Sequence, residues 1–188
     1  EQGLDDSTMV VFTSDHGTNF GDNLWRVIGK PGNALLPGTM HLPLIVRHPD
    51  GLGAGRRIDG LRYNIDITAS IYDLLDVPPS QAIEGRSLLP ALAGDHAAGA
   101  RTYVTSRYGN TTWYRDERWW VFCDVTAGDR HVFDLQADPE LTTDLGGTDA
   151  AAEAFDLAWS RILADAGGSL PDYRQVRRTD AIGQPPAD

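Results

Sequence analysis

Two short, uninterrupted apolar runs stand out in the first fifty residues. They occupy positions 9–13 and 42–47, and neither alternates apolar with polar side chains. Runs of this kind are typical of strands that are buried on both faces, as in parallel sheets covered by helices. Pro43 fits the start or the edge of the second strand, because proline cannot donate to a sheet ladder. The pattern therefore predicts two strands of an α/β sheet.

A loop separates these two runs, and a helix follows them. Four glycines lie between residues 17 and 32, a composition typical of loops. After residue 64 the apolar positions take a helical spacing, with a predicted apolar face of Ile67, Ile71, Leu74 and Leu75. Asp66 or Thr68 is a suitable N-cap, and consecutive prolines at 78 and 79 end the helix.

The pattern changes again near Arg101. Aromatic and β-branched residues then form closely spaced runs with turns between them, at 102–107, 111–114, 119–125 and 130–135. Such runs predict a small antiparallel meander. The segment 150–166 has helical spacing, and its apolar stripe can cover one face of the meander through Phe155, Ala158, Trp159, Ile162 and Leu163.

These elements divide the chain into an α/β portion and a small α+β portion. We place the first at residues 1–100 and the second at residues 101–173. The segment 174–188 contains two prolines and a glycine and is expected to be a flexible tail. A chain of 188 residues is long enough for one ordinary domain and a small appendage.

Composition and charge narrow the class of protein. Hydrophobic residues make up 41% and charged residues 23% of the chain, the range of folded globular proteins rather than disordered ones. The net charge of −11 argues against nucleic acid as a partner, because phosphate binding requires a basic surface. No apolar run approaches the ~20 residues of a membrane span. An acidic protein that handles anions must concentrate positive charge locally, at a metal ion or a few cations.

The single cysteine and the first residues add two expectations. Cys123 excludes an intramolecular disulfide and cysteine-based zinc sites, and its alternating surroundings predict an inert packed thiol. The chain lacks an initiator Met, and its first apolar run begins within ten residues of Glu1, so we expect a C-terminal piece of a longer protein. Any export signal would precede Glu1, which leaves a cytoplasmic and an exported protein equally open.

Asp15 and His16 are the first candidates for chemistry. They come just after the first apolar run and before Gly17, which permits a turn. Sites of α/β proteins lie at the carboxyl ends of strands. A carboxylate beside an imidazole suits a divalent cation of intermediate hardness, without choosing the metal. The alternative is an aspartate that caps a turn, with a hydrogen-bonded histidine beside it.

Lys30 and His41 are two further candidates. Lys30 is the only lysine among 16 Lys and Arg residues, and an ammonium suits an anionic oxygen beside a metal ion. His41 precedes the second apolar run and can project toward the same sheet edge. Each has an ordinary alternative: a solvated loop lysine in one case, a structural histidine at a strand start in the other.

An ordered series of motifs resembles the sulfatase family of the alkaline phosphatase-like superfamily. The motifs are SDHG at 14–17, a Gly-Asp pair followed by Lys30, HLPLIVRHP at 41–49, NIDITASIYDLL at 64–75, EGRSLLPALAG at 84–94 and HVFDLQADPELTTDL at 131–145. The resemblance implies the C-terminal part of an alkaline phosphatase-like sandwich, with a mostly parallel sheet and helices. A small subdomain with an antiparallel sheet and a helix would follow it.

The resemblance also implies roles for the candidate residues. Asp15 and His16 match the pair that ligates the active-site divalent ion, usually Ca²⁺ in sulfatases, with Mg²⁺, Mn²⁺ or Zn²⁺ as alternatives. Lys30 matches the lysine that contacts the sulfate and the leaving-group oxygen, and His41 matches a position near the site that can supply a proton or a hydrogen bond. Asp66 matches a position that we interpret as a helix cap and not as a ligand.

The chain departs from the family pattern at several positions. Asn23 stands where the family commonly has a histidine. The family's formylglycine nucleophile, made from the Cys or Ser of a C/S-x-P-x-R motif, has no counterpart here, nor has its early pair of aspartates. Both are expected in a missing N-terminal portion of the same protein, so the isolated chain is expected to be inactive.

The resemblance predicts that the full-length protein is a sulfuric ester hydrolase acting on small-molecule or glycan sulfate esters. The nearest alternative is a phosphonate or phosphate ester hydrolase of the same superfamily, which shares the Asp–His pair. A non-catalytic binding module and an incomplete gene product are further alternatives. The joint presence of Asp15, His16 and Lys30 argues against a binding module, since a scaffold has no chemical need of all three.

Overall fold

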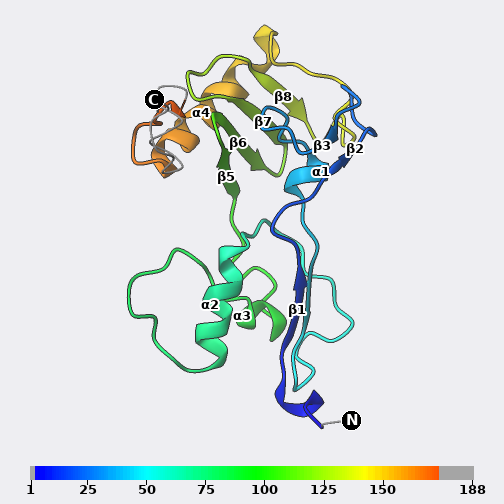
Figure 1. The fold of residues 1–188 in the computed structure, drawn as a ribbon, viewed down its shortest axis with the longest axis vertical. Coiled ribbons are helices and arrows are strands. Elements are labelled where there is room, and N and C mark those ends of the chain that lie inside the picture. Colours follow the sequence, from blue (N-terminus) through cyan, green and yellow to red (C-terminus); the bar gives the residue numbers. More distant parts are fainter. Residues whose placement is uncertain (1–2, 174–188) are drawn as a thin grey trace, which may run out of the picture. The chain divides into compact units, whose positions relative to one another are not determined.

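The computed structural model describes residues 3–173, so the predicted tail at 174–188 lies outside the described residues. The chain forms two compact units, which we describe one at a time (Figure 1). Within the described residues the first unit contains 3–17 and 40–104, and the second contains 18–39 and 105–173. Residues 18–39 group with the later part of the chain, while the domain boundary predicted at residue 100 stays a prediction.

The first unit contains an antiparallel ribbon of two strands. After the short 3-10 helix η1 (Asp5–Ser7), β1 (Val10–Thr13) pairs with β4 (Leu44–Arg47). The register sets Val11 opposite Val46 and Thr13 opposite Leu44. Two helices follow the ribbon in the chain, α2 (Ile65–Leu74) and the shorter α3 (Leu89–Leu92).

The direction of these strands corrects one expectation. We predicted a mostly parallel sheet, whereas β1 and β4 run antiparallel. An uninterrupted apolar run indicates burial, but it contains no information on the direction of the partner strand. After β1 the chain runs through residues 18–39, which belong to the other unit. Strand β4 then begins opposite the end of β1, so the two strands run in opposite directions. The mixed helix-and-sheet character of the unit agrees with the prediction.

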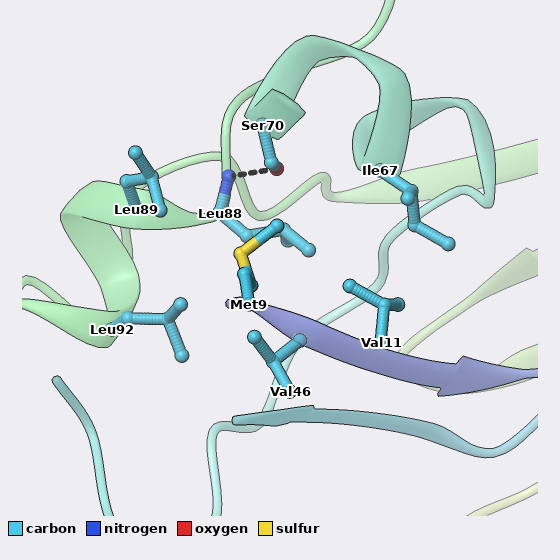
Figure 2. A pocket seen from close by; sticks show the side chains of 8 residues that line it. All are labelled: Met9, Val11, Val46, Ile67, Ser70, Leu88, Leu89 and Leu92. Carbon is cyan, nitrogen blue, oxygen red and sulfur yellow. Dashed lines mark hydrogen bonds between the residues drawn. The ribbon is translucent and has the colours of Figure 1, made fainter. Parts of the chain in front are cut away.

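Helices cover one face of the ribbon. Figure 2 shows Val11 and Val46 facing Ile67 of α2 and Leu92 of α3 around a small apolar pocket. The Ser70 hydroxyl accepts the backbone N–H of Leu88 at 2.8 Å beside this pocket and joins the two helical segments. The pocket is thus part of the packed interior of the first unit.

The other face of the ribbon is exposed and apolar. Val10, Phe12 and Ile45 alternate with the packed positions, and they are 49%, 59% and 62% exposed. The prediction that both strands are buried on both faces is therefore wrong within residues 3–173. The apolar runs fit two covered faces, but the described residues cover only one.

A buried ion pair connects α2 to two later segments of the first unit. Asp66 is fully buried, and its carboxylate oxygens accept hydrogen bonds from the Arg101 guanidinium at 2.6 and 2.8 Å. The backbone N–H groups of Tyr63 and Arg86 donate to the same carboxylate, each at 2.8 Å. Burial alone would raise the pKa of Asp66, but these hydrogen bonds outweigh it and lower the pKa below its ordinary value. The N-cap position of α2 is Asn64 and has no side-chain capping hydrogen bond, so the predicted capping role of Asp66 or Thr68 is wrong, and Asp66 connects segments instead.

The second unit contains a four-stranded sheet in chain order, as predicted. The strands are β5 (Tyr103–Tyr108), β6 (Thr111–Asp116), β7 (Trp119–Asp124) and β8 (His131–Asp134). The pairs β6–β7 and β7–β8 are antiparallel. After the 3-10 helix η2 (Asp149–Ala151), α4 (Ala152–Asp165) contacts β6 and β7. It buries three residues of the predicted stripe, Phe155, Ala158 and Ile162, together with Ala154, whereas Trp159 and Leu163 are partly exposed.

Residues 18–39 add three short elements to this second unit. They are β2 (Asn19–Phe20), which pairs antiparallel with β3 (Ile28–Gly29), and most of α1 (Pro37–Met40). Leu35 and Leu36 are almost fully buried, and the indole N–H of Trp120 donates to the Leu35 carbonyl at 2.9 Å. The stretch is therefore part of the core. In residues 3–173, no helix has the length and apolarity needed to cross a membrane.

Replacing Asp66 with Ala is expected to lower the free energy of unfolding by about 3–5 kcal/mol, because it leaves the Arg101 guanidinium buried without its partner. Urea denaturation followed by circular dichroism measures this change. The control is Asp59→Ala, which removes a carboxylate that is 87% exposed beside Arg57, and it should change stability by less than about 1 kcal/mol. Equal losses in the two variants would contradict the role of the buried pair.

Acid is expected to destabilise the protein through the same carboxylate. The pKa of Asp66 is lowered from the ordinary 3.8 in the folded chain, so its ionised form stabilises the fold fully above that value. The contribution is lost as the pH falls from 3.8 through the lowered pKa, since the unfolded chain takes up the proton first. Unfolding free energies measured down to about pH 2 should fall more steeply for the wild type than for Asp66→Asn. Parallel curves would count against this explanation.

Candidate active site

The β1–β4 ribbon positions three of the four predicted site residues. Asp15 and His16 come just after β1, and His41 lies three residues before β4. Because Thr13 pairs with Leu44, the end of β1 and the start of β4 lie at the same end of the ribbon. The strand pairing therefore brings Asp15, His16 and His41 to one end of the first unit.

Local contacts hold Asp15 and His16 beside each other. The Oδ1 atom of Asp15 accepts the backbone N–H of His16 at 2.9 Å, and its Oδ2 atom lies 3.6 Å from His16 Nε2. The Ser14 hydroxyl donates to the His16 carbonyl at 2.7 Å and closes the turn. The Asp15 side chain is 83% exposed and the His16 side chain 44% exposed, so both are accessible in this unit.

The Gly17 carbonyl selects the tautomer of His16. The oxygen of this carbonyl lies 2.9 Å from His16 Nδ1. A carbonyl oxygen can only accept, so Nδ1 holds the proton in this hydrogen bond. In the neutral ring the lone pair is then on Nε2, the nitrogen that lies 3.6 Å from the Asp15 carboxylate. A backbone carbonyl that fixes the tautomer in this way is a usual support for a metal-bound imidazole.

The Asp15–His16 pair fits part of a divalent-cation site. Carboxylate oxygen suits Ca²⁺, Mg²⁺ and Mn²⁺, and imidazole nitrogen suits Zn²⁺ and related ions. A calcium ion in a protein binds roughly six to eight oxygen ligands. Within residues 3–173 no group of three or more His, Cys, Asp or Glu side chains is arranged to hold a metal ion. Asp15 and His16 alone are fewer than the ligands that a divalent-cation site needs.

Lys30 belongs to the other compact unit. It follows β3 directly, and its side chain is exposed. The side-chain amide of Asn19, which is 2% exposed, donates to the carbonyl of Gly29 at 3.0 Å and to the Thr39 hydroxyl at 2.8 Å. The backbone immediately before Lys30 is thus tied into the second unit.

Comparison with known proteins shows which family the chain resembles. The Sulfatase family model matches residues 1–77. Over 93% of its length the chain is 29% identical to the multifunctional alkaline phosphatase superfamily protein PehA from Trinickia caryophylli. Over 92% of its length it is 23% identical to an arylsulfatase from Clostridium perfringens.

The chain is similar to the sulfatase family and to related hydrolases of the alkaline phosphatase superfamily. Its fold is also similar to that of the phosphonate monoester hydrolase of Agrobacterium radiobacter, with a TM-score of 0.74, 25% sequence identity and 89% of the chain covered. The chain spans 38% of the length of PehA and 36% of that of the arylsulfatase and of the phosphonate hydrolase. The similarity therefore extends over almost the whole chain but over little more than a third of each relative.

Asn23 departs from the sulfatase pattern and closes the loop between β2 and β3. Its Oδ1 atom accepts the N–H of Val27 at 2.9 Å, and its Nδ2 atom donates to the Val27 carbonyl at 3.1 Å. The Gly21 N–H reaches the same carbonyl at 2.9 Å. Because an amide supplies a donor and an acceptor together, the departure cross-links the loop that precedes Lys30.

Sequence analysis did not single out Trp25, which lies in this loop. Its ring meets Phe122, Phe133 and His131 edge-on, at centroid distances of 6.0, 5.8 and 5.0 Å. A tryptophan in a glycine-rich loop indicates that its large apolar ring packs against another part of the chain. The pattern contained no information on which of the later aromatic residues would receive it.

The carboxylates of the late motif at 131–145 brace turns. Asp134 accepts the Arg118 guanidinium at 2.8 Å, and Asp138 accepts the Thr142 hydroxyl at 2.9 Å. Asp144 lies 2.6 Å from His131 Nδ1 and also accepts two backbone N–H groups. Local hydrogen bonds of this kind account for three of the four acids of the motif, all but Glu140.

Cys123 is the buried, inert thiol that its surroundings predicted. It is free and 1% exposed, with the Thr112 hydroxyl 3.3 Å from its sulfur. Burial raises the pKa of the Cys123 thiol to about 11. At neutral pH it therefore holds its proton and lacks the thiolate that cysteine chemistry requires.

Nitrogen NMR of the histidine rings is expected to show opposite tautomers at two positions. Neutral His16 should hold its proton on Nδ1, because that atom donates to the Gly17 carbonyl. Buried His48 is the internal control: its Nδ1 accepts the backbone N–H of Asp50 at 3.1 Å, so its proton should be on Nε2. The same tautomer at both histidines would overturn the assignment at His16.

Proposed function

We propose that this chain is the C-terminal part of a hydrolase that cleaves sulfate monoesters. The observation that carries the proposal is the placement of Asp15, His16 and His41 at one end of the β1–β4 ribbon. An acid, an imidazole and a second imidazole at one strand end form a set that can bind a cation and move a proton. The match of residues 1–77 to the Sulfatase family supports the same reaction class.

Asp15 and His16 are the proposed ligands of a divalent cation, with Ca²⁺ as the first choice and Mg²⁺, Mn²⁺ or Zn²⁺ as alternatives. When bound, the cation supplies positive charge that polarises the ester and neutralises its anionic oxygens. Asp15 offers its carboxylate, and the Gly17 carbonyl holds His16 with its Nε2 lone pair toward that carboxylate. Two ligands are too few for tight binding by this chain alone.

Lys30 and His41 are the proposed catalytic groups. As the bond from sulfur to the ester oxygen breaks, negative charge grows on that oxygen, and the Lys30 ammonium stabilises it. His41 donates a hydrogen bond or a proton to the same leaving group. The net charge of −11 makes such local cations necessary, because the chain as a whole repels an anionic substrate.

The remaining parts of the site are proposed to lie in an N-terminal portion of the same protein. They are a formylglycine nucleophile and further metal ligands, and without them the isolated chain is inactive. The exposed apolar face formed by Val10, Phe12 and Ile45 supports such a partner, because apolar faces of this kind mark interfaces. The coverage of 36–38% of its relatives agrees with a larger enzyme.

A phosphonate or phosphate ester hydrolase is the second candidate. The likeness to the Agrobacterium radiobacter phosphonate monoester hydrolase favours it, with a TM-score of 0.74 and 25% identity. A cation with a lysine beside it can neutralise a sulfate, a phosphate or a phosphonate ester, since all three are anionic. Rates of the full-length protein on matched aryl sulfate, aryl phosphate and aryl phosphonate esters distinguish the candidates. The sulfatase proposal predicts the highest kcat/KM on the sulfate.

Lys30→Ala in the full-length enzyme is expected to lower kcat by on the order of 10² or more, because it removes a charge that acts on the developing oxyanion. Steady-state kinetics on the best aryl ester measures the loss. Arg57→Ala is the matched control, since it removes a cation whose side chain is 92% exposed and paired with Asp59. Its kcat should stay at the wild-type value. An unchanged kcat in Lys30→Ala would refute the role of this lysine.

A further inference from the structure

The hairpin that bears Lys30 has little stability of its own. The strands β2 and β3 contain two residues each, and an isolated two-stranded hairpin is marginal in water. Its cross-strand pair, Phe20 and Ile28, is 79% and 78% exposed and therefore buries little apolar surface. Contacts with the rest of the second unit must fix the position of Lys30.

Trp25 makes such a contact from the loop between the two strands. Its indole meets the rings of Phe122 and Phe133 edge-on, at 6.0 and 5.8 Å, and these two side chains are 1% and 0% exposed. Edge-to-face geometry is one that aromatic pairs prefer. The indole itself remains 40% exposed, so it lies on top of the aromatic core rather than inside it.

The surface that receives Trp25 is itself rigid. The His131 ring lies 5.0 Å from the indole and 4.6 Å from Phe122. Its Nδ1 atom is 2.6 Å from Asp144 Oδ2, while the other oxygen of Asp144 accepts the backbone N–H groups of Val132 and Gly146. The indole therefore docks on a group whose orientation is already set by hydrogen bonds.

The hairpin is held at its other end by Asn19, whose amide donates to the carbonyl of Gly29 at 3.0 Å. Lys30 follows that carbonyl directly, and Trp25 precedes it by five residues. The loop between them is closed by the two hydrogen bonds from Asn23 to Val27. A displacement at Trp25 is thus transmitted along a short, cross-linked segment to Lys30.

We propose that Trp25 is a positioning residue for Lys30. Its packing on Phe122, Phe133 and His131 holds the hairpin so that the Lys30 ammonium meets the leaving-group oxygen in the transition state. This inference rests on the proposed function of Lys30. Loss of the indole should act on the bond-breaking step, because a misplacement of about 1 Å far from the chemistry can reduce a rate by ~10²-fold.

The test uses the full-length enzyme and two aryl sulfates, one with a nitrophenol and one with an unsubstituted phenol as leaving group. A poor leaving group needs more stabilisation, so Lys30→Ala should lose more kcat on phenyl sulfate than on nitrophenyl sulfate. Trp25→Ala should show the same dependence, with a loss of ~10- to 10²-fold on phenyl sulfate. Trp25→Phe keeps the edge-on contact and should recover most of the lost kcat. Phe20→Ala on the same hairpin should leave both rates unchanged.

The outcomes separate this inference from the function on which it rests. Without a leaving-group-dependent loss in Lys30→Ala, the proposed function of Lys30 fails. With that loss present, an equal loss on both substrates in Trp25→Ala, or none, overturns the positioning role. If Trp25→Ala does not fold, Trp25→Leu retains apolar burial without the aromatic contact. Trp25→Leu should show the same dependence on the leaving group. If it does not, the positioning role of Trp25 is overturned.

Discussion

The register of β1 against β4 is the constraint on which the candidate site depends. Two antiparallel strands with Thr13 opposite Leu44 place the residues that follow one strand beside the residues that precede the other. A shift of one residue would turn the apolar side chains of a strand to the opposite face, so the packing of Val11 and Val46 on the helices also fixes this register. The same apolar contacts that stabilise the ribbon thus decide which end of it bears Asp15, His16 and His41.

Several strands and helices could be predicted from the sequence, because strand and helix periodicities depend only on neighbouring residues. The aromatic and β-branched runs gave the strands β5–β8, and the helical stripe gave α4, because strand and helix periodicities are properties of one segment. Strand direction and the assignment of residues 18–39 to the second unit could not be found in this way. Both depend on which distant segments pack together, and Trp25 on Phe122 is such a contact.

The candidate site shows the same limit at the level of single side chains. The motifs singled out Asp15, His16, Lys30 and His41, yet the chain contains 27 acidic residues that composition alone does not rank. The structure distinguishes several of these acids by their hydrogen bonds and their exposure. Asp66 and Asp144 are taken up by guanidinium, imidazole and backbone donors and act as braces, whereas the Asp15 side chain is 83% exposed. Which acids brace the fold is decided by hydrogen bonds between distant segments, and no spacing rule contains that information.

The proposed chemistry places a demand on the two compact units that neither meets alone. Asp15, His16 and His41 belong to the first unit and Lys30 to the second, and the chain crosses between the units after residues 17, 39 and 104. Lys30 lies on a 22-residue segment, 18–39, that is connected along the chain to the first unit at both ends. The proposed role of Lys30 further asks that this segment be rigid within the second unit. Asn19, Asn23, Trp25 and the buried Leu35 provide that rigidity within the second unit, which explains why so short a hairpin is anchored at so many points.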